Sequence, residues 1–259
     1  MSIFAVVILA VIQGLTEFLP VSSSGHLALA GIVINVPRED IIFEIVVHLG
    51  TLVAVISVYW KDLAALLTGL MRRDQQAVRM IGLLALGSVP AAAAGFFLSG
   101  SIEALFDDPL LVSLMLIVTG SVLYGTKFLG KHRRERPTWA GSFIIGVSQA
   151  MALLPGISRS GLTISTGLFA GVRRDNAARF SFLLSIPAIM GAAMLKLSET
   201  GGVSVLTADT AVGFAVSALT GYLALKVLLR FVKKGKLSVF SWYCWLLGLT
   251  GLTLIVAGV

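Results

Sequence analysis

Residues 13–26 read QGLTEFLPVSSSGH, and this stretch determines how the rest of the chain has to fold. It places a carboxylate (Glu17), three consecutive serine hydroxyls and an imidazole (His26) in an otherwise apolar region. A continuous helix tolerates Pro20 and the Ser/Gly turn poorly, so we expect a helix to break here.

The same pattern returns 136 residues later, where residues 149–161 read QAMALLPGISRSG. Four positions coincide without a gap: Gln13 with Gln149, Ser22 with Ser158, Ser24 with Ser160, and Gly25 with Gly161. Three chemically important positions differ: Glu17 corresponds to Leu153, Ser23 to Arg159, and His26 to Leu162. One copy therefore offers acid, base and hydroxyl groups, and the other offers a fixed cation.

The composition of the chain indicates an integral membrane protein. Hydrophobic residues make up 57% of its 259 residues and charged residues only 13%, too few charges to cover a soluble globule of this size. The apolar segments are about as long as the ~20 residues that a membrane-spanning helix needs. The net charge of +7 does not indicate nucleic-acid binding, because Lys and Arg gather in short loops, as they do in cytoplasmic loops. We expect an all-α polytopic membrane protein.

Six apolar segments are candidate spanning helices: residues 43–60, 80–98, 110–128, 180–197, 210–229 and 238–258. Two further apolar regions, 2–34 and 139–171, each carry one copy of the motif in the middle.

The charges of the loops indicate the side of the membrane on which each loop lies. Basic residues predominate in three loops, at residues 61–79, 127–137 and 226–236, which we expect in the cytoplasm. Three loops hold little or no Lys and Arg and are expected to face outward: residues 35–42, 99–109 and 198–209.

The loop at 127–137 is expected in the cytoplasm and the loop at 198–209 outside, so the chain between them must cross the membrane an odd number of times. Segment 180–197 supplies one crossing, so region 139–171 must enter and leave the membrane on the same face. By the same logic, region 2–34 dips in from outside. Three spanning segments separate the two re-entrant hairpins, so the second is inverted relative to the first. We expect one membrane domain built as an inverted-topology repeat, with halves at about 1–130 and 137–259.

The two motifs have the residue types of an anion site. Gln13 and Glu17 share one face of a helix, at i and i+4. A helix that begins near His26 has free backbone N–H groups and the positive end of its dipole, which together with the serine hydroxyls attract an anion. The second copy adds Arg159, whose planar guanidinium suits a phosphate group. If the hairpins meet tip to tip, two helix starts and one Arg surround a single anion.

Ordinary structural roles compete with this interpretation. A Ser-Ser-Ser-Gly turn is most often a helix cap, and His26 could simply satisfy a helix terminus. Glu44 and His48, again at i and i+4, could face water at the membrane surface or belong to the site, and Thr163 could hydrogen-bond within its own helix. Arg159 is hardest to explain in this way, because an unpaired Arg at mid-membrane is strongly disfavoured.

The chain resembles the bacterial undecaprenyl-diphosphatase family, also called the bacitracin-resistance protein. The resemblance covers essentially the whole chain and rests on four segments: QGLTEFLPVSSSGH at 13–26, FEIVVHLG at 43–50, PGISRSGLT at 155–163 and FSFLLSIP at 180–187. It implies hydrolysis of undecaprenyl diphosphate to the monophosphate and phosphate at the outer face of the bacterial cytoplasmic membrane, which recycles the carrier lipid for peptidoglycan. It also implies a homodimer and dependence on a divalent cation, Mg²⁺ or Ca²⁺.

With this resemblance, the motifs lead to a mechanistic hypothesis. Ser23 attacks the terminal phosphorus, Glu17 or His26 removes its proton, and Arg159 stabilises the phosphoryl oxygens. His26 could instead be the phosphoryl acceptor. Glu17 is also the expected metal ligand, with the cation bridging it to the diphosphate. Eight further residues are expected to bind substrate: Gln13, Ser22, Ser24, Gly25, Ser158, Ser160, Gly161 and Thr163.

The family has Glu or Gln at the position of Gln13. The glutamine found here can orient or ligate but cannot act as a base.

A different class of function also fits the repeat, because broken helices in inverted repeats are typical of transporters. A transporter or flippase for a lipid phosphate or other anion is therefore the alternative to a phosphatase.

Overall fold

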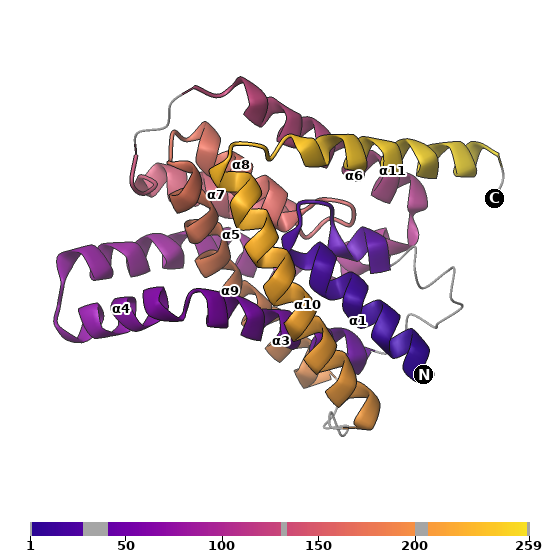
Figure 1. The fold of residues 1–259 in the computed structure, drawn as a ribbon, viewed down its shortest axis with the longest axis horizontal. Coiled ribbons are helices and arrows are strands. Elements are labelled where there is room, and N and C mark those ends of the chain that lie inside the picture. Colours follow the sequence, from indigo (N-terminus) through magenta and orange to yellow (C-terminus); the bar gives the residue numbers. More distant parts are fainter. Residues whose placement is uncertain (1, 28–40, 131–133, 200–206, 258–259) are drawn as a thin grey trace.

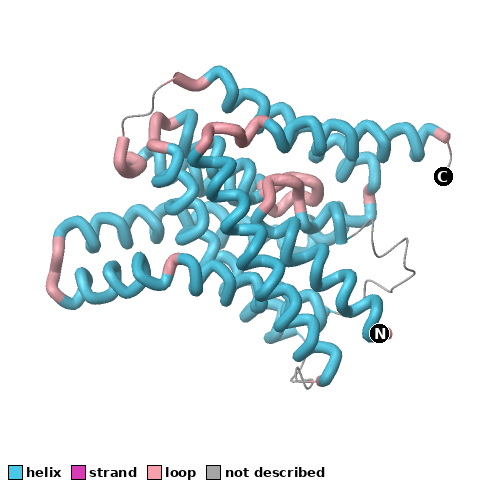
Figure 2. Tube along the Cα trace, in the orientation of Figure 1, coloured by secondary structure: helices cyan, strands magenta, loops and turns pink. Residues whose placement is uncertain are grey.

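The computed structural model describes residues 2–27, 41–130, 134–199 and 207–257, and within these ranges the chain is almost entirely helical (Figures 1 and 2). The α-helices are α1 (Ile3–Phe18), α3 (Ile41–Val58), α4 (Trp60–Met71), α5 (Gln75–Ala104), α6 (Pro109–Gly125), α7 (Trp139–Met151), α8 (Arg159–Phe169), α9 (Arg174–Glu199), α10 (Ala208–Lys233) and α11 (Val239–Val256). Short 3-10 turns follow α5 (η1, Leu105–Asp107) and α6 (η2, Thr126–Phe128). The all-α prediction is confirmed.

The spanning helices lie where the apolar segments predicted them. Five helices, α5, α6, α9, α10 and α11, are long and apolar enough to cross a membrane, and α3 with α4 makes a sixth if this bent pair is one span. Each predicted segment overlaps one of these helices. The predicted outward loops 35–42 and 198–209, and the linker 130–137, lie largely or partly outside the described residues.

The loop expected at residues 61–79 is largely helical in the structure. Helix α4 occupies most of it, bent by 72° from α3, and α5 already begins at Gln75. The charges of Lys61 and Asp62 suggested the end of a helix, but the Leu- and Ala-rich sequence that follows them propagates another one. Figure 1 shows α4 and the start of α5 projecting together from the bundle.

Both motifs interrupt helices, as predicted. Helix α1 ends at Phe18, and the chain is helical again from residue 23 to residue 27; the rest of the expected return arm, residues 28–34, lies outside the described residues. In the second copy, α7 ends at Met151 and α8 begins at Arg159. Helices α1, α7 and α8 have 16, 13 and 11 residues, fewer than the ~20 needed to span a bilayer. They are half-helices.

The hairpin of each half of the chain packs against a spanning helix of the other half. Helix α1 of the first half packs along α10 of the second, and α7 of the second half packs along α5 of the first. Gly14 and Gly146 make these crossings close: a Cβ on Gly14 would collide with Thr220 of α10, and one on Gly146 with the backbone of Gly87 in α5. Two inverted repeats would produce this reciprocal packing, although the boundaries 1–130 and 137–259 stay a prediction.

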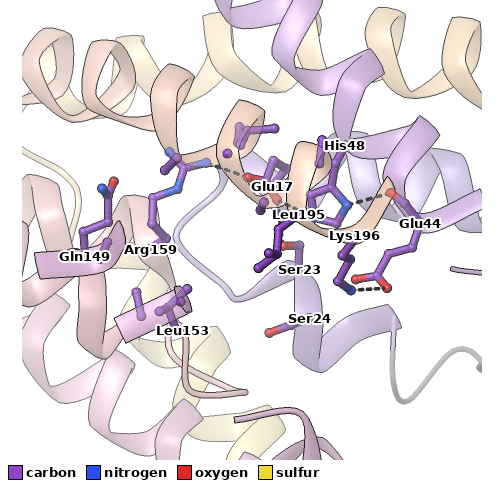
Figure 3. A pocket seen from close by; sticks show the side chains of 18 of the residues that line it. Glu17, Ser23, Ser24, Glu44, His48, Gln149, Leu153, Arg159, Leu195 and Lys196 are labelled. Atoms are coloured by element: carbon purple, nitrogen blue, oxygen red, sulfur yellow. Dashed lines mark hydrogen bonds and ion pairs between the residues drawn. The ribbon is translucent and has the colours of Figure 1, made fainter. Parts of the chain in front are cut away.

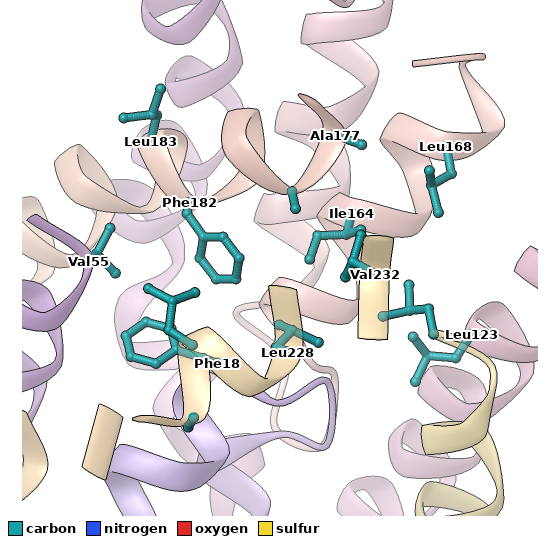
Figure 4. Close-up of a cluster of buried hydrophobic side chains, with 14 of the residues drawn as sticks. Phe18, Val55, Leu123, Ile164, Leu168, Ala177, Phe182, Leu183, Leu228 and Val232 are labelled. Atoms are coloured by element: carbon teal, nitrogen blue, oxygen red, sulfur yellow. The ribbon is translucent and has the colours of Figure 1, made fainter. Parts of the chain in front are cut away.

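The largest apolar core lies where the two halves meet (Figure 4). Phe18, the last residue of α1, is fully buried there and makes an edge-to-face contact with Phe182 of α9, with 5.8 Å between the ring centroids. Ile164 of α8 and Leu228 of α10 belong to the same core. Because Phe18 anchors the end of α1, the side chain of the preceding residue, Glu17, has a fixed direction.

Candidate active site

The two motif copies have the same local hydrogen bonds. In the first, the Ser22 hydroxyl accepts from the Gly25 backbone N–H at 3.4 Å and lies 3.2 Å from the Ser24 hydroxyl. In the second copy, the Ser158 hydroxyl accepts from the Gly161 N–H at 3.2 Å and lies 3.3 Å from the Ser160 hydroxyl. Both serines act as N-caps of short helices. The ordinary structural role therefore applies to Ser22 and Ser158, whereas the side chains of the residues that follow them, Ser23 and Arg159, both contact Glu17.

The two hairpin tips touch. A Cβ on Gly161 would lie 3.1 Å from Cβ of Pro20, and a Cβ on Gly25 would lie 3.9 Å from Cα of Gly156. Thr119 of α6 holds the second break in place, because its hydroxyl donates to the Gly156 carbonyl and accepts from the Ser158 N–H, both at 3.1 Å. The breaks of two half-helices far apart in the sequence therefore form one site.

Glu17 is the centre of this site (Figure 3). Its Oε2 accepts hydrogen bonds from Gln13 Nε2 at 3.1 Å and from the Ser23 hydroxyl at 2.9 Å. Its Oε1 forms an ion pair with Arg159 Nη2 at 2.5 Å. His48 Nε2 of α3 lies 3.8 Å from Oε2. The Glu17 side chain is only 8% exposed, so its charge needs these partners.

A cavity of about 540 Å³ opens beside Glu17. Its polar wall includes Ser22, Ser23, Ser24, His48, Ser158 and Arg159. Its apolar wall comes largely from α5 and α9, through residues such as Ala91, Phe96, Pro187, Ala192 and Leu195. The cavity is therefore amphiphilic: it has charged side chains at Arg159 and at the Glu44–Lys196 pair, and an apolar wall from α5 and α9.

His26 does not join this group. Its Nδ1 lies 2.7 Å from the Ser22 carbonyl oxygen and its Nε2 lies 2.6 Å from the Tyr243 hydroxyl of α11. The two rings are also stacked, with centroids 5.6 Å apart. His26 is thus not among the residues that line the cavity, and the imidazole near Glu17 belongs to His48.

The other expected substrate-binding residues pack around the residues of the site. Gln13 is fully buried against Glu17, and Gly25 packs on Ser22. Thr163 donates to the Arg159 carbonyl at 2.7 Å, the back-bond considered from its sequence, and lies 2.6 Å from the Ser181 hydroxyl of α9. Ser160 and Gly161 are buried in the α8 cap and at the tip contact described above.

Two further residues of the wall had no role in the sequence hypothesis: Gln149 was noted only as the counterpart of Gln13, and Lys196 was not noted. For Glu44 the sequence left an interface role and a site role open. Its Oε2 pairs with Lys196 Nζ at 3.1 Å, and its carbonyl oxygen lies 2.8 Å from His48 Nδ1. The i, i+4 spacing of Glu44 and His48 was the one available signal. Nothing in the sequence could locate Lys196, because its helix meets α3 only in the folded protein.

Comparison with known proteins identifies the family. The family model described as bacitracin resistance protein BacA matches residues 6–250. The chain is 42% identical to an undecaprenyl-diphosphatase of Desulforapulum autotrophicum, with 100% of this chain and 99% of the relative aligned. It is 38% identical to one of Halothermothrix orenii, with both chains fully covered, and 40% identical to one of Pelotomaculum thermopropionicum, covering 99% and 98%. The chain belongs to the BacA family.

The residues at the hairpin tips offer few ligands for a divalent cation. No cluster of three or more His, Cys, Asp or Glu side chains occurs in the described ranges. Glu17 is the one carboxylate at the hairpin tips, and both of its oxygens already have partners. Mg²⁺ and Ca²⁺ prefer several oxygen ligands, so the residues present fit such an ion as one protein ligand completed by diphosphate oxygens and water.

Proposed function

We propose that the chain is a membrane phosphatase that hydrolyses undecaprenyl diphosphate to undecaprenyl phosphate and inorganic phosphate. The observation that carries this proposal is the cluster of Glu17, Ser23 and Arg159 in the polar wall of an amphiphilic cavity. A polyprenyl diphosphate has the matching shape, an anionic head on an apolar chain. The relatives in three organisms bear the name of this activity.

The hydrogen bond from Ser23 to Glu17 Oε2 supports Ser23 as the nucleophile. In this mechanism, the Ser23 oxygen forms a bond to the terminal phosphorus while the bond from that phosphorus to the bridging oxygen breaks. The Ser23 proton passes to Glu17, and undecaprenyl phosphate leaves. Water then hydrolyses the phosphoserine and releases phosphate. His26 would have to leave Tyr243 to take the same role, so the geometry favours Ser23 over His26 as the phosphoryl acceptor.

Arg159 can pair with two anions: with Glu17 in the free protein and with the diphosphate when substrate binds. Without substrate it pairs with Glu17, and a diphosphate, with its greater charge, competes for the guanidinium. Movement of Arg159 toward the phosphoryl oxygens would stabilise them and free Glu17 to accept the Ser23 proton. A divalent cation held by Glu17 and the diphosphate would supply further neutralisation of the phosphate charge.

The lining of the cavity supports an active site on the outer side of the membrane. Three lining residues lie in or next to segments whose charges predict an outward position: Glu44 next to 35–42, Phe106 within 99–109, and Lys196 next to 198–209. We therefore place hydrolysis at the outer face of the bacterial cytoplasmic membrane, where it returns the carrier lipid for cell-wall synthesis. A homodimer, as the resemblance implies, is part of the same proposal.

Phosphate release by the purified protein tests this function. In detergent with Mg²⁺ or Ca²⁺, the wild type should release phosphate from undecaprenyl diphosphate, and Glu17→Gln, which keeps the shape but not the charge, should not. Ser57→Ala is the matched control, because the Ser57 hydroxyl only donates to the Val53 carbonyl within α3. Absence of release by the wild type with every divalent cation would reject the proposal.

A flippase or transporter of lipid phosphate is the second candidate function. The hairpins pack reciprocally on the two halves, and broken helices in paired halves are typical of transporters. Movement of a labelled prenyl phosphate across liposomes containing the protein, without phosphate release, would favour this candidate.

A further inference from the structure

Gln149 of α7 carries the least satisfied polar side chain of the cavity wall. It lines the cavity and is 2% exposed. Within the described part of the chain, neither its Nε2 nor its Oε1 has a hydrogen-bond partner. Buried amides are nearly always paired, because an unpaired one lowers stability. The missing partner is therefore expected to come from outside the chain.

The first motif copy shows why this amide is unpaired. Its counterpart Gln13 donates to Glu17, four residues further along α1. The residue four positions after Gln149 is Leu153, which has no acceptor. The glutamine side chain is therefore hydrogen-bonded within its own helix in the first hairpin. In the second hairpin it faces the cavity without a hydrogen-bond partner among the described residues.

A second unpaired donor lies at the same end of the cavity. Arg159 uses Nη2 for its ion pair with Glu17, but its Nη1 is buried and, among the described residues, has no hydrogen-bond partner. Figure 3 shows Gln149 and Arg159 at one end of the pocket and the Glu44–Lys196 pair at the other. A guanidinium only donates, so a ligand that satisfies this end must offer acceptor oxygens and negative charge.

We propose that Gln149 binds the substrate, donating through Nε2 to a non-bridging oxygen of the diphosphate at the end of the cavity where Arg159 Nη1 is free. The identity of the lipid rests on the proposed function, whereas the recognition of a phosphate anion does not. An amide neither gains nor loses a proton in this reaction, so Gln149 contributes affinity for the anion rather than proton transfer. Its loss should raise KM and leave kcat nearly unchanged.

The test compares Gln149→Met, which keeps the length of the side chain and removes its hydrogen bonds, with Ser148→Ala. Ser148 is the neighbouring residue, and its hydroxyl only donates to the Ile145 carbonyl of the same helix. Two quantities are measured in detergent: KM for undecaprenyl diphosphate, and the concentration of inorganic pyrophosphate that half-maximally raises the unfolding temperature. Gln149→Met should raise both by about tenfold, the effect of one hydrogen bond to a charged group. Ser148→Ala should raise neither.

The unliganded protein provides a further readout. Because Gln149→Met removes an unpaired buried amide, its unfolding temperature without ligand should equal or exceed that of the wild type. A lower unfolding temperature together with an unchanged pyrophosphate response would show a structural role and overturn the proposal. Gln149→Glu, which keeps the shape and adds a negative charge, should weaken pyrophosphate binding more than Gln149→Met does, and unchanged binding in this variant would also overturn it.

The outcomes separate this inference from the proposed function. Phosphate release by the wild type with an unchanged KM in both Gln149 variants would reject the inference alone. Pyrophosphate stabilisation that depends on Gln149, in a protein that releases no phosphate from any prenyl diphosphate, would reject the phosphatase and retain the anion site.

Discussion

Arg159 at the start of α8 forms an ion pair with Glu17 at the end of α1, between residues 142 positions apart in the sequence. Each side chain comes from the interrupted point of a different half-helix. The pair therefore joins the two hairpins electrostatically at the same place where Pro20 and Gly161 join them sterically.

Breaking this pair on one side should destabilise the protein more than removing both charges. Arg159→Met leaves Glu17 buried and unpaired, which costs about 3 kcal/mol or more. In the double variant Glu17→Gln, Arg159→Met, the buried charge is gone, and most of that stability should return. Thermal unfolding of the four proteins in detergent, followed by tryptophan fluorescence, measures the coupling; additive losses would contradict the pairing.

Replacement of Ser23 by Ala should lower kcat by at least about a thousandfold, because the hydroxyl that Glu17 orients would be the attacking group. His26→Ala should lower kcat far less, since its side chain contacts Tyr243 and the Ser22 carbonyl instead of the cavity. Steady-state phosphate release by both variants decides between the two residues. Substantial turnover by Ser23→Ala would transfer the attack to a histidine or to water.

His48→Ala should reduce turnover by roughly a hundredfold, the lower end of the range for a group that assists proton transfer. The imidazole lies 3.8 Å from the Glu17 carboxylate, and its other nitrogen contacts the Glu44 carbonyl, which fixes the direction of the ring. His48→Gln, which retains hydrogen-bonding capacity, should keep more activity than His48→Ala. Wild-type kcat and KM in both variants would exclude a role for His48.

Gly146→Ala should strongly destabilise the protein, because the added methyl group would overlap the Gly87 backbone where α7 crosses α5. Gly100→Ala is the matched control within α5: no atom of the described residues lies within 4 Å of its added Cβ, and alanine favours a helix by about 1 kcal/mol over glycine. The unfolding temperature should fall clearly in the first variant and stay level or rise in the second. Equal stability of the two would show that the helices do not cross this closely.

Removal of divalent cations by EDTA should abolish phosphate release, and Mg²⁺ or Ca²⁺ should restore it. Because Glu17 is the one carboxylate at the hairpin tips, the protein without substrate should bind these ions only weakly, and undecaprenyl diphosphate should increase the apparent affinity. Titration calorimetry without substrate and cation-dependent kinetics with it provide the comparison. Full activity in excess EDTA would remove the cation from the mechanism.

The helices and their breaks could be predicted from the sequence because they depend on local patterns. Apolar segments gave the spanning helices, and the Pro/Ser/Gly motif gave the interruptions at residues 19–22 and 152–158. Helix α4 was missed because two charges, on Lys61 and Asp62, were interpreted as a loop, although they occupy only its first turn.

The site was predictable only in part, because burial and long-range contacts decide which polar groups meet. Arg159 could be expected beside Glu17, since both follow from the motif copies. The direction of His26 depends on Tyr243, 217 residues away. The lack of an acceptor four residues after Gln149 could be seen in the sequence, but the burial of Gln149 in the cavity wall could not.

The reciprocal packing of the two hairpins explains why the two halves must carry different side chains at their tips. An assembly of two copies of the first half would place two carboxylates against each other at the tips, and two copies of the second half would place two guanidinium groups there. Like charges at such a buried point repel strongly. Fusing two differing halves into one polypeptide allows an otherwise symmetric scaffold to hold opposite charges at its centre.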